Sequence, residues 1–426
     1  MDDTGTRREA GTTTGTTSWW QRQLPPSPLA RSLSVQSILF AVGEGTFITG
    51  SAVFFTQVVG LSAAQVGIGL TVAGVVSFFF AVPAGKLADR VGTKRMWAIG
   101  AGLTALLYLV WPLIHGFAAY LAMMVVLEVV SQAGWSGRGA YTIDIFTREE
   151  RVQSQAFMRA ALNIGFTVGA LIGGLALATN SDAVVRAVPI LTGVILLANT
   201  WWITRLPDPP TKAPKHADDQ VVKPRALRNR PFLALMTGDG VLGTNQVLLN
   251  IVIPLWLVEE TDAPRVLLAW LFATNTVMAV LLQVAAARGV DSVARSLRAS
   301  YISSGFFVLS CAIVLVTHDT VGWITIALVW LGHVTVTGAE LYQSAGHWGF
   351  MSDLTDADQR AEYQGAAHIG GTLGSVWAPA LYTWLAMEHG SIGWITIAAI
   401  VAVSTLTMGP SARAAERYLA RHGSAT

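Results

Sequence analysis

Cysteine and charge are the two things that this sequence has least of. One of its 426 residues is cysteine, Cys311, which excludes an intrachain disulfide and any cysteine-rich metal cluster. Only 13% of the residues are charged, about half of the ~25% that is usual in soluble domains. Hydrophobic residues make up 52%, whereas a disordered chain would combine low hydrophobicity with high charge. The composition therefore predicts a chain whose solvent is mostly lipid.

Several functional motifs are also missing. The sequence has no phosphate-binding loop of the type G-x-x-x-x-G-K-[ST], no H-E-x-x-H zinc motif and no G-x-S-x-G nucleophile elbow. The net charge of +2 and the lack of a basic cluster with interleaved aromatic residues argue against nucleic acid as a partner. We therefore expect no enzymatic activity, no cofactor and no metal.

Long apolar runs fill most of the chain. A helix that spans a bilayer needs roughly 20 mainly apolar residues, and the sequence divides into twelve such runs. The expected fold is an all-α membrane protein of twelve transmembrane helices in two pseudo-symmetric six-helix bundles. The expected spans are 33–59, 62–86, 94–113, 118–142, 156–179, 184–204, 232–258, 265–287, 299–317, 322–350, 363–387 and 391–409.

Positive charges predict the orientation of these spans. Of the 28 Lys and Arg residues, only Arg186 and Arg265 fall in segments on one side, which leaves 28 − 2 = 26 on the side of the N-terminus. Basic residues concentrate in cytoplasmic segments of membrane proteins. Both termini should therefore be cytoplasmic, in a plasma membrane of the bacterial type.

A proline-rich, basic segment divides the chain into halves. The expected parts are a disordered cytoplasmic tail (1–32), an N-terminal bundle (33–205), a cytoplasmic linker (206–231), a C-terminal bundle (232–410) and a cytoplasmic tail (411–426). We expect a monomer in contact with membrane lipid.

The two halves resemble each other in sequence. Gly43-Glu44-Gly45 in span 1 is matched by Gly238-Asp239-Gly240 in span 7. Glu128 precedes Ala133-Gly134 at the same spacing as Glu340 precedes Ala345-Gly346. Asp144, Arg151 and Gln155 recur with identical spacing as Asp353, Arg360 and Gln364. Three matches in order indicate an internal duplication, which in transporters places the binding site between the repeats.

The loop between spans 2 and 3 has a distinctive pattern. Residues 85–95 read G-K-L-A-D-R-V-G-T-K-R, and the pattern resembles the signature G-x-L-A-D-R-x-G-x-[KR]-[KR] of the major facilitator superfamily. With the span count and the linker, the resemblance covers about residues 33–410. It implies a transporter without enzymatic activity, and a gating motif made of Gly85, Asp89, Arg90, Gly92, Lys94 and Arg95.

Within this motif, the resemblance implies that Asp89 faces the start of span 11 and links the halves. Because a carboxylate is favoured at a helix N-terminus, we expect Asp89 to stabilise an outward-open state. The alternative is that the loop is only a topology signal.

Span 5 offers a second resemblance. Residues 165–174 read G-F-T-V-G-A-L-I-G-G, similar to the end of the proton-antiporter signature G-x-x-x-G-P-x-x-G-G, with Ala170 in place of proline. Packing of small residues between helices explains the same glycines.

Four acids fall well inside the expected spans, where an ionisable group is costly unless it faces a cavity or a partner. Burial in a low dielectric raises the pKa of a carboxyl group, so that it exchanges a proton near neutral pH. The candidates for proton coupling are Glu44, Glu128, Glu340 and Asp239, and we expect them to converge on one watery chamber. The alternative is that these groups join helices structurally.

Polar residues that share helix faces with these acids, and similar polar stripes on spans 5 and 11, indicate the wall of a substrate cavity. Trp135 is included because an aromatic side chain there could line a pocket for an apolar ligand. The candidates are Gln132, Trp135, Asn163, Gln246, Asn250, His333, Thr337 and His368. Arg138 and Arg159 are expected near the inner ends, where they reach the interface or neutralise Asp144.

The function that these features favour is secondary active transport by alternating access. The expected activity is proton-coupled export of a small amphipathic or apolar compound, a drug or secondary metabolite. The direction rests on the resemblance to drug:proton antiporters. Two alternatives stay open: uptake of a small nutrient, by proton coupling or facilitation, and a non-transporting membrane sensor on the same fold.

Overall fold

The computed structural model describes residues 25–179, 181–210, 226–264 and 266–422. Within these ranges the chain forms helices joined by short turns and contains no strand, as the all-α prediction requires. Most of the expected N-terminal tail and the middle of the expected linker lie outside the described residues. The first helix begins at Pro28, five residues before the expected boundary, with Ser27 as its N-cap.

The N-terminal bundle has six crossings. Helix ends follow local signals: the Ser62 side chain accepts from the Gln65 N–H and the Gln65 side chain accepts from the Ser62 N–H, which starts the second helix. The helices are α1 (Pro28–Val53, continued by a π-helical turn Phe54–Val58), α2 (Ala63–Val91), α3 (Thr93–Val110), α4 (Phe117–Asp144), α5 (Arg148–Ala178) and α6 (Asp182–Arg205).

The C-terminal bundle also has six crossings, two of them broken. The first consists of α7 (Arg230–Leu242), α8 (Asn245–Val247), a π-helical turn (Leu248–Val252) and α9 (Ile253–Glu259). Then follow α10 (Leu267–Ala287), α11 (Val293–Leu315), α12 (Trp323–Asp353), α13 (Arg360–Ser375) and α14 (Ala378–His422). The last helix folds back at Gly390, where φ is +47°, so α13 and α14 together cross twice.

Ten helical segments of the described chain are long and apolar enough to cross a membrane. They count Arg360–His422 as one segment, although it bends into two crossings, and they do not include α1. With these two additions the fold has the twelve predicted crossings.

The internal repeat is visible in the backbone. The Gly-Glu-Gly and Gly-Asp-Gly triplets lie in the first crossing of each bundle, and each crossing later contains a π-helical turn, Phe54–Val58 in one and Leu248–Val252 in the other. Such turns are rare and interrupt the regular helix, so their recurrence at matching places supports a duplicated unit.

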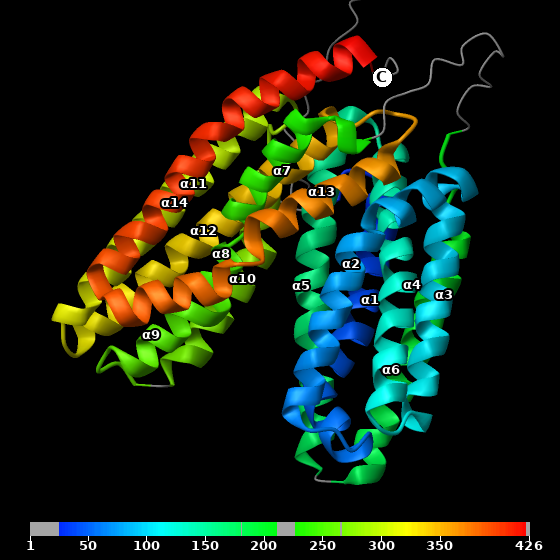
Figure 1. The fold of residues 1–426 in the computed structure, drawn as a ribbon, viewed down its shortest axis with the longest axis horizontal. Coiled ribbons are helices and arrows are strands. Elements are labelled where there is room, and N and C mark those ends of the chain that lie inside the picture. The colour runs from blue at the N-terminus through cyan, green and yellow to red at the C-terminus, as the bar shows by residue number, and fades with distance from the viewer. Residues whose placement is uncertain (1–24, 180, 211–225, 265, 423–426) are drawn as a thin grey trace, which may run out of the picture.

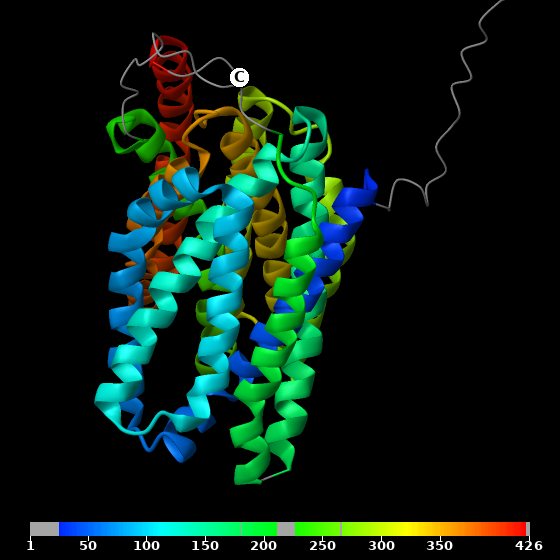
Figure 2. The ribbon, with the colours of Figure 1, turned by 90° about the vertical axis from the view of Figure 1, so that its right-hand side faces the viewer.

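The two bundles meet at one end of the molecule and diverge toward the other (Figure 1). At the end where they meet, here called the closed end, α13 lies against α2 and α10 lies against α5. Seen from the N-terminal side, the helices of that bundle run alongside one another from this end to the opposite, open end (Figure 2).

Three glycines of span 5 allow α1 and α5 to approach closely. A Cβ atom added at Gly165, Gly169 or Gly173 would lie only 2.5–2.6 Å from a carbonyl oxygen of α1. Small residues at four-residue spacing let two membrane helices pack backbone to backbone. These glycines, which also match the antiporter pattern, therefore have a packing role.

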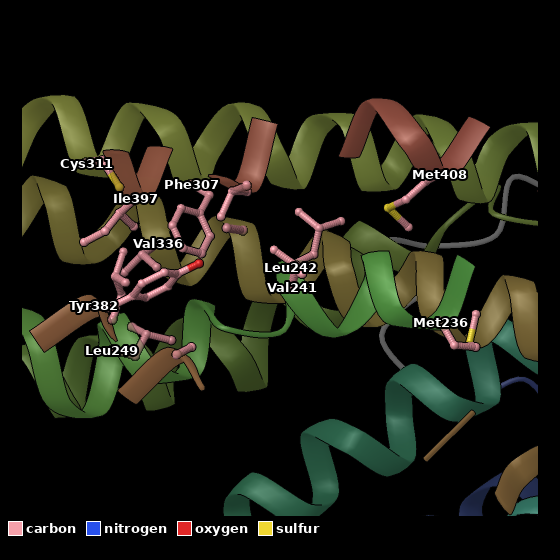
Figure 3. Packing of buried hydrophobic residues seen from close by; sticks show 14 of the residues in the cluster. Met236, Val241, Leu242, Leu249, Phe307, Cys311, Val336, Tyr382, Ile397 and Met408 are labelled. Atoms are coloured by element: carbon pink, nitrogen blue, oxygen red, sulfur yellow. The ribbon is translucent and has the colours of Figure 1, made fainter. Parts of the chain in front are cut away.

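After the bend at Gly390 the last helix continues to His422, although the sequence predicted a separate tail from residue 411. Ala412 and Ala415 are fully buried against the core of the C-terminal bundle, which explains why the helix continues. Figure 3 shows part of this core, where Phe307, Val336 and Tyr382 fill the space between helices.

Candidate functional site

A cavity of about 690 Å³ lies between the bundles, in the size range of sites for small organic ligands. Its wall combines α2, α4 and α5 of the N-terminal bundle with α7, α12 and α13 of the C-terminal bundle. We call it the central cavity. Its polar and aromatic lining residues include Ser77, Glu128, Gln132, Trp135, Arg138, Gln155, Arg159, Asp239, Gln246, Glu340, Gln343, His347, Trp348, Gln364 and His368.

Asp239 has two polar partners at the cavity wall. Its Oδ1 accepts a hydrogen bond from Gln343 Nε2 at 3.0 Å, and His347 Nδ1 lies 2.6 Å from Oδ2. The Asp239 side chain is 6% exposed. Both partners stand on α12, so the carboxylate of α7 holds the half of that helix nearer the closed end.

Glu340 joins the two bundles. Its Oε1 lies 3.6 Å from Arg159 Nη2 of α5, and its Oε2 accepts from Asn275 Nδ2 of α10 at 3.0 Å. We predicted that Arg159 reaches the membrane interface or neutralises Asp144; this is wrong, because α12 places Glu340 next to it.

Glu128 also lines the central cavity, and no described residue donates a hydrogen bond or forms an ion pair to it. Glu44 lies elsewhere. It accepts from the Tyr108 hydroxyl at 3.1 Å and lines a second cavity of about 330 Å³ inside the N-terminal bundle. We predicted that all four acids converge on one chamber. This is wrong for Glu44, because its side chain faces α3.

Four of the eight predicted cavity residues line the central cavity: Gln132, Trp135, Gln246 and His368. The hydroxyl of Ser77 links two of them, at 3.3 Å from Gln132 Oε1 and 3.2 Å from His368 Nε2, and so connects α2, α4 and α13.

The other four lie outside the central cavity wall. Asn250 is exposed and donates to the backbone oxygen of Gln246 at 2.9 Å. His333 and Thr337 share a helix face with Glu340 but are buried where the half of α12 nearer the open end meets α10. Asn163 is half-buried on α5. Helical spacing alone cannot tell which neighbour a face will meet.

At the closed end, Asp89 caps the next bundle's helix. Its two carboxylate oxygens accept from the backbone N–H groups of Ala361, at 3.1 Å, and Glu362, at 2.9 Å, in the first turn of α13. Gly85, one turn earlier, faces the Ala361 carbonyl so closely that an added Cβ would clash. The negative charge of Asp89 and the absence of a side chain at Gly85 together allow α2 and α13 to pack closely.

The remaining motif residues surround this contact. Gly92 has φ +103°, which separates α2 from α3, and Lys94 Nζ lies 3.0 Å from Asp208. Arg90 and Arg95 are exposed. Lys86, inside the same pattern, reaches Glu362 across the bundles at 3.8 Å.

The two repeated Asp residues, Asp144 and Asp353, each form an ion pair with an Arg of the other bundle. Asp144, at the end of α4, pairs with Arg360 at the start of α13. Asp353, at the end of α12, pairs with Arg148 at the start of α5 at 3.2 Å. Asp144 is therefore neutralised by Arg360 of the other bundle. The sequence had suggested Arg138 or Arg159 for this role, and that prediction is wrong.

Sequence reasoning did not assign Asn275 or Gln343 to the site, and it placed Arg138 wrongly. Asn275 and Gln343 hold the acids Glu340 and Asp239, and Gln343 could have been found because it precedes His347 by one helical turn. Arg138 is buried inside the bundle, where its Nη2 donates to Ser37 Oγ at 3.0 Å. No local pattern announces that contact.

Known proteins share this fold. A family model described as Major Facilitator Superfamily matches residues 33–379. None of the proteins of curated function matches the sequence.

Among solved structures, the chain is similar to a bacterial homologue of the iron transporter ferroportin in an outward-facing state, with 13% identity, a TM-score of 0.69 and coverage of 91% of this chain and 100% of that chain. It is similar to the Escherichia coli fucose:proton symporter, with 15% identity, a TM-score of 0.63 and coverage of 91% and 98%. It is also similar to a proton:xylose symporter, with 12% identity, a TM-score of 0.68 and coverage of 90% and 94%. The twelve crossings, the loop motif and the matched family model together show that this chain belongs to the Major Facilitator Superfamily.

Proposed function

We propose that this protein is a proton-coupled exporter of a small amphipathic compound, working by alternating access. The observation that carries the proposal is the central cavity, which lies between the repeats and brings Glu128, Asp239 and Glu340 to one wall. Acids inside a membrane protein are retained where they face a cavity and take part in transport. Superfamily membership supports transport, and the acids support proton coupling.

The orientation follows from the basic residues. The closed end carries the loops α2–α3 and α4–α5 and both described edges of the linker, where Lys and Arg concentrate. By the positive-inside rule this end is cytoplasmic, in a plasma membrane of the bacterial type. The structure then represents the outward-open state, with both termini in the cytoplasm.

The lining of the central cavity favours an amphipathic substrate. Trp135, Trp348 and Met158 offer apolar contact, whereas Gln132 and Gln246 offer amide groups that both donate and accept. A ligand with an aromatic or alkyl part and a few polar groups would satisfy both kinds of wall.

A proton can act on the contact between Glu340 and Arg159. This pair joins α12 to α5 across the bundles, so protonation of Glu340 removes an ion pair that favours the present arrangement. A two-state carrier responds only to a ligand that binds one state better than the other. Protonation of Glu340 biases the carrier toward the other state. A substrate bound in the same cavity is coupled to that change.

An accumulation screen in an efflux-deficient host, with and without an uncoupler, first identifies a transported compound. Transport of that compound is then measured in proteoliposomes with an imposed pH gradient. Export coupled to protons requires that the compound moves against the proton flow. Glu340→Gln should abolish this coupling, and Glu416→Gln, a carboxylate on the exposed face of α14, serves as the matched control. Movement with the protons would establish uptake, and no flux at all would favour a sensor.

Asp89 and Gly85 are proposed to hold the cytoplasmic end closed. Gly85→Leu should keep α2 and α13 apart, because the carbonyl of Ala361 occupies the space. Gly74→Leu, on the same helix with nothing near an added Cβ, is the control. Spin labels at Val91→Cys, at the end of α2, and at Leu227→Cys, in the turn Ala226–Arg228 before α7, report the separation of the two bundles, since the native Cys311 is buried. An unchanged distance in Gly85→Leu would contradict the closure role.

A further inference from the structure

The second cavity divides the interior of the N-terminal bundle. We call it the side chamber; it measures about 330 Å³ and lies between α1, α3, α4 and α6. The buried apolar residues on either side form two separate clusters, one toward the open end that includes Tyr108 and Leu196, and one toward the closed end that includes Trp97. In the C-terminal bundle most buried apolar residues belong to one large cluster instead, with Phe307 and Cys311 in its interior (Figure 3).

Aromatic rings surround the side chamber. Phe40 and Trp135 meet edge to face, with their ring centroids 5.3 Å apart, and Phe166 and Tyr108 complete the wall. Such rings offer flat apolar surfaces and favour offset or edge contacts with a further ring. The chamber therefore suits a planar ligand better than a bulky one.

Two ionisable side chains, Glu44 and Arg138, line the side chamber. The Tyr108 hydroxyl donates to Oε2 of Glu44. No described residue donates a hydrogen bond to the other oxygen of that carboxyl group, Oε1. Arg138 is 7% exposed and lies 5.2 Å from the centroid of Trp135, and its Nε is buried without a hydrogen-bond partner among the described residues. An unpaired buried donor costs free energy, so a ligand acceptor at that place would be favoured.

The side chamber adjoins the central cavity. Trp135 and Arg138 line both, so these two side chains stand between them. Trp135 is 42% exposed, so part of its ring faces open space.

We propose that the side chamber is a second ligand subsite, which takes a planar aromatic group carrying a hydrogen-bond donor for Glu44 and an acceptor for Arg138. This inference deepens the proposed transport function and rests on it for the entry of the ligand from the central cavity. Binding to the chamber itself can be measured without transport.

The test uses purified protein in lipid nanodiscs and the planar dye danthron, a dihydroxyanthraquinone, with binding followed by calorimetry and by quenching of tryptophan fluorescence. Ser131 lines the side chamber and Ser344 lines the central cavity, which gives a matched pair of substitutions. Ser131→Leu should weaken binding at least about tenfold, and Ser344→Leu by less than about twofold.

Where Ser131→Leu fails to fold, Thr104→Leu fills the same chamber from α3 and replaces it. The inference is overturned if danthron does not bind the parent protein, or if Ser344→Leu weakens binding and the chamber variants do not. Binding that is sensitive to Ser131→Leu, without flux of danthron in proteoliposomes, would leave the subsite standing and count against the transport function. Flux of danthron that Ser131→Leu does not change would support the transport function and count against the subsite.

Discussion

The two bundles come from one duplicated pattern and yet differ in their interiors. Glu44 and Asp239 occupy the same place in the repeat, between two glycines of the first crossing. In the N-terminal bundle the acid turns inward, toward Tyr108 and the side chamber. In the C-terminal bundle it meets Gln343 and His347 at the central cavity, and the interior behind it is filled.

This difference teaches that a repeat determines where an acid stands along a helix, while the neighbouring helices decide what it does. Tyr108 of α3 offers a hydroxyl in one bundle, whereas α11 offers Phe307 and Cys311 in the other. The two repeat-related acids, Glu44 and Asp239, can therefore have different roles.

The largest effect should come from opening the filled interior. Phe307→Ala removes a fully buried ring and should destabilise the protein by about 3 kcal/mol, since the space cannot collapse. Phe40→Ala, at the edge of the side chamber, should cost about 1 kcal/mol because the ring already borders a cavity. Thermal unfolding in detergent compares the two. Equal losses would show that the bundles are equally well packed.

The two repeat-related acids provide the next comparison. Asp239→Asn should lower proton-driven transport about 100-fold, or about 2.7 kcal/mol, because both carboxylate oxygens have partners in the central cavity. Glu44→Gln should lower it about tenfold. Counterflow without a pH gradient should persist in both variants. Asp291→Asn in an exposed turn is the control, and a larger loss in Glu44→Gln than in Asp239→Asn would reverse the assignment.

The reciprocal ion pairs test whether the bundles contribute equally to closure. Asp144 and Arg360 are each 10% exposed, whereas Arg148 in the second pair is 61% exposed. Asp144→Asn should therefore shift the equilibrium between closed and open states about tenfold, and Arg148→Gln only about twofold. Spin-label distances at the closed end measure both. A charge exchange, Asp144→Arg with Arg360→Asp, should restore closure.

The smallest expected effect concerns the hydroxyl of Tyr108. Tyr108→Phe removes one hydrogen bond to Glu44 and keeps the ring that lines the side chamber. Hydrogen bonds inside membrane proteins are worth about 0.6 kcal/mol on average, which predicts a change of roughly threefold in transport. The transport assay in proteoliposomes measures it, and a loss as large as that of Glu44→Gln would mean that the hydroxyl itself carries protons.

Much of the architecture could be predicted from the chain. Runs of apolar residues indicated twelve crossings, and the matched triplets and the loop motif indicated two related bundles. These features are local, because span length and helical period are properties of consecutive residues.

The candidate site was less accessible to such reasoning. His333 and Thr337 lie on the same face as Glu340, but the half of α12 nearer the open end meets α10 before that face reaches the cavity. Arg159 and Arg138 looked like interface residues, but they face Glu340 and Ser37. Each of these outcomes depends on helices that are distant in the chain.

By itself the amino-acid sequence determined the number of crossings, the distribution of positive charge and the kinds of chemical group available inside the membrane. Only the tertiary structure decided that three acids share one cavity while Glu44 lines another, and that Asp144 closes on Arg360 of the opposite bundle. The physical reason is that a helix specifies the angles between its own side chains, whereas the partner at each angle comes from long-range packing.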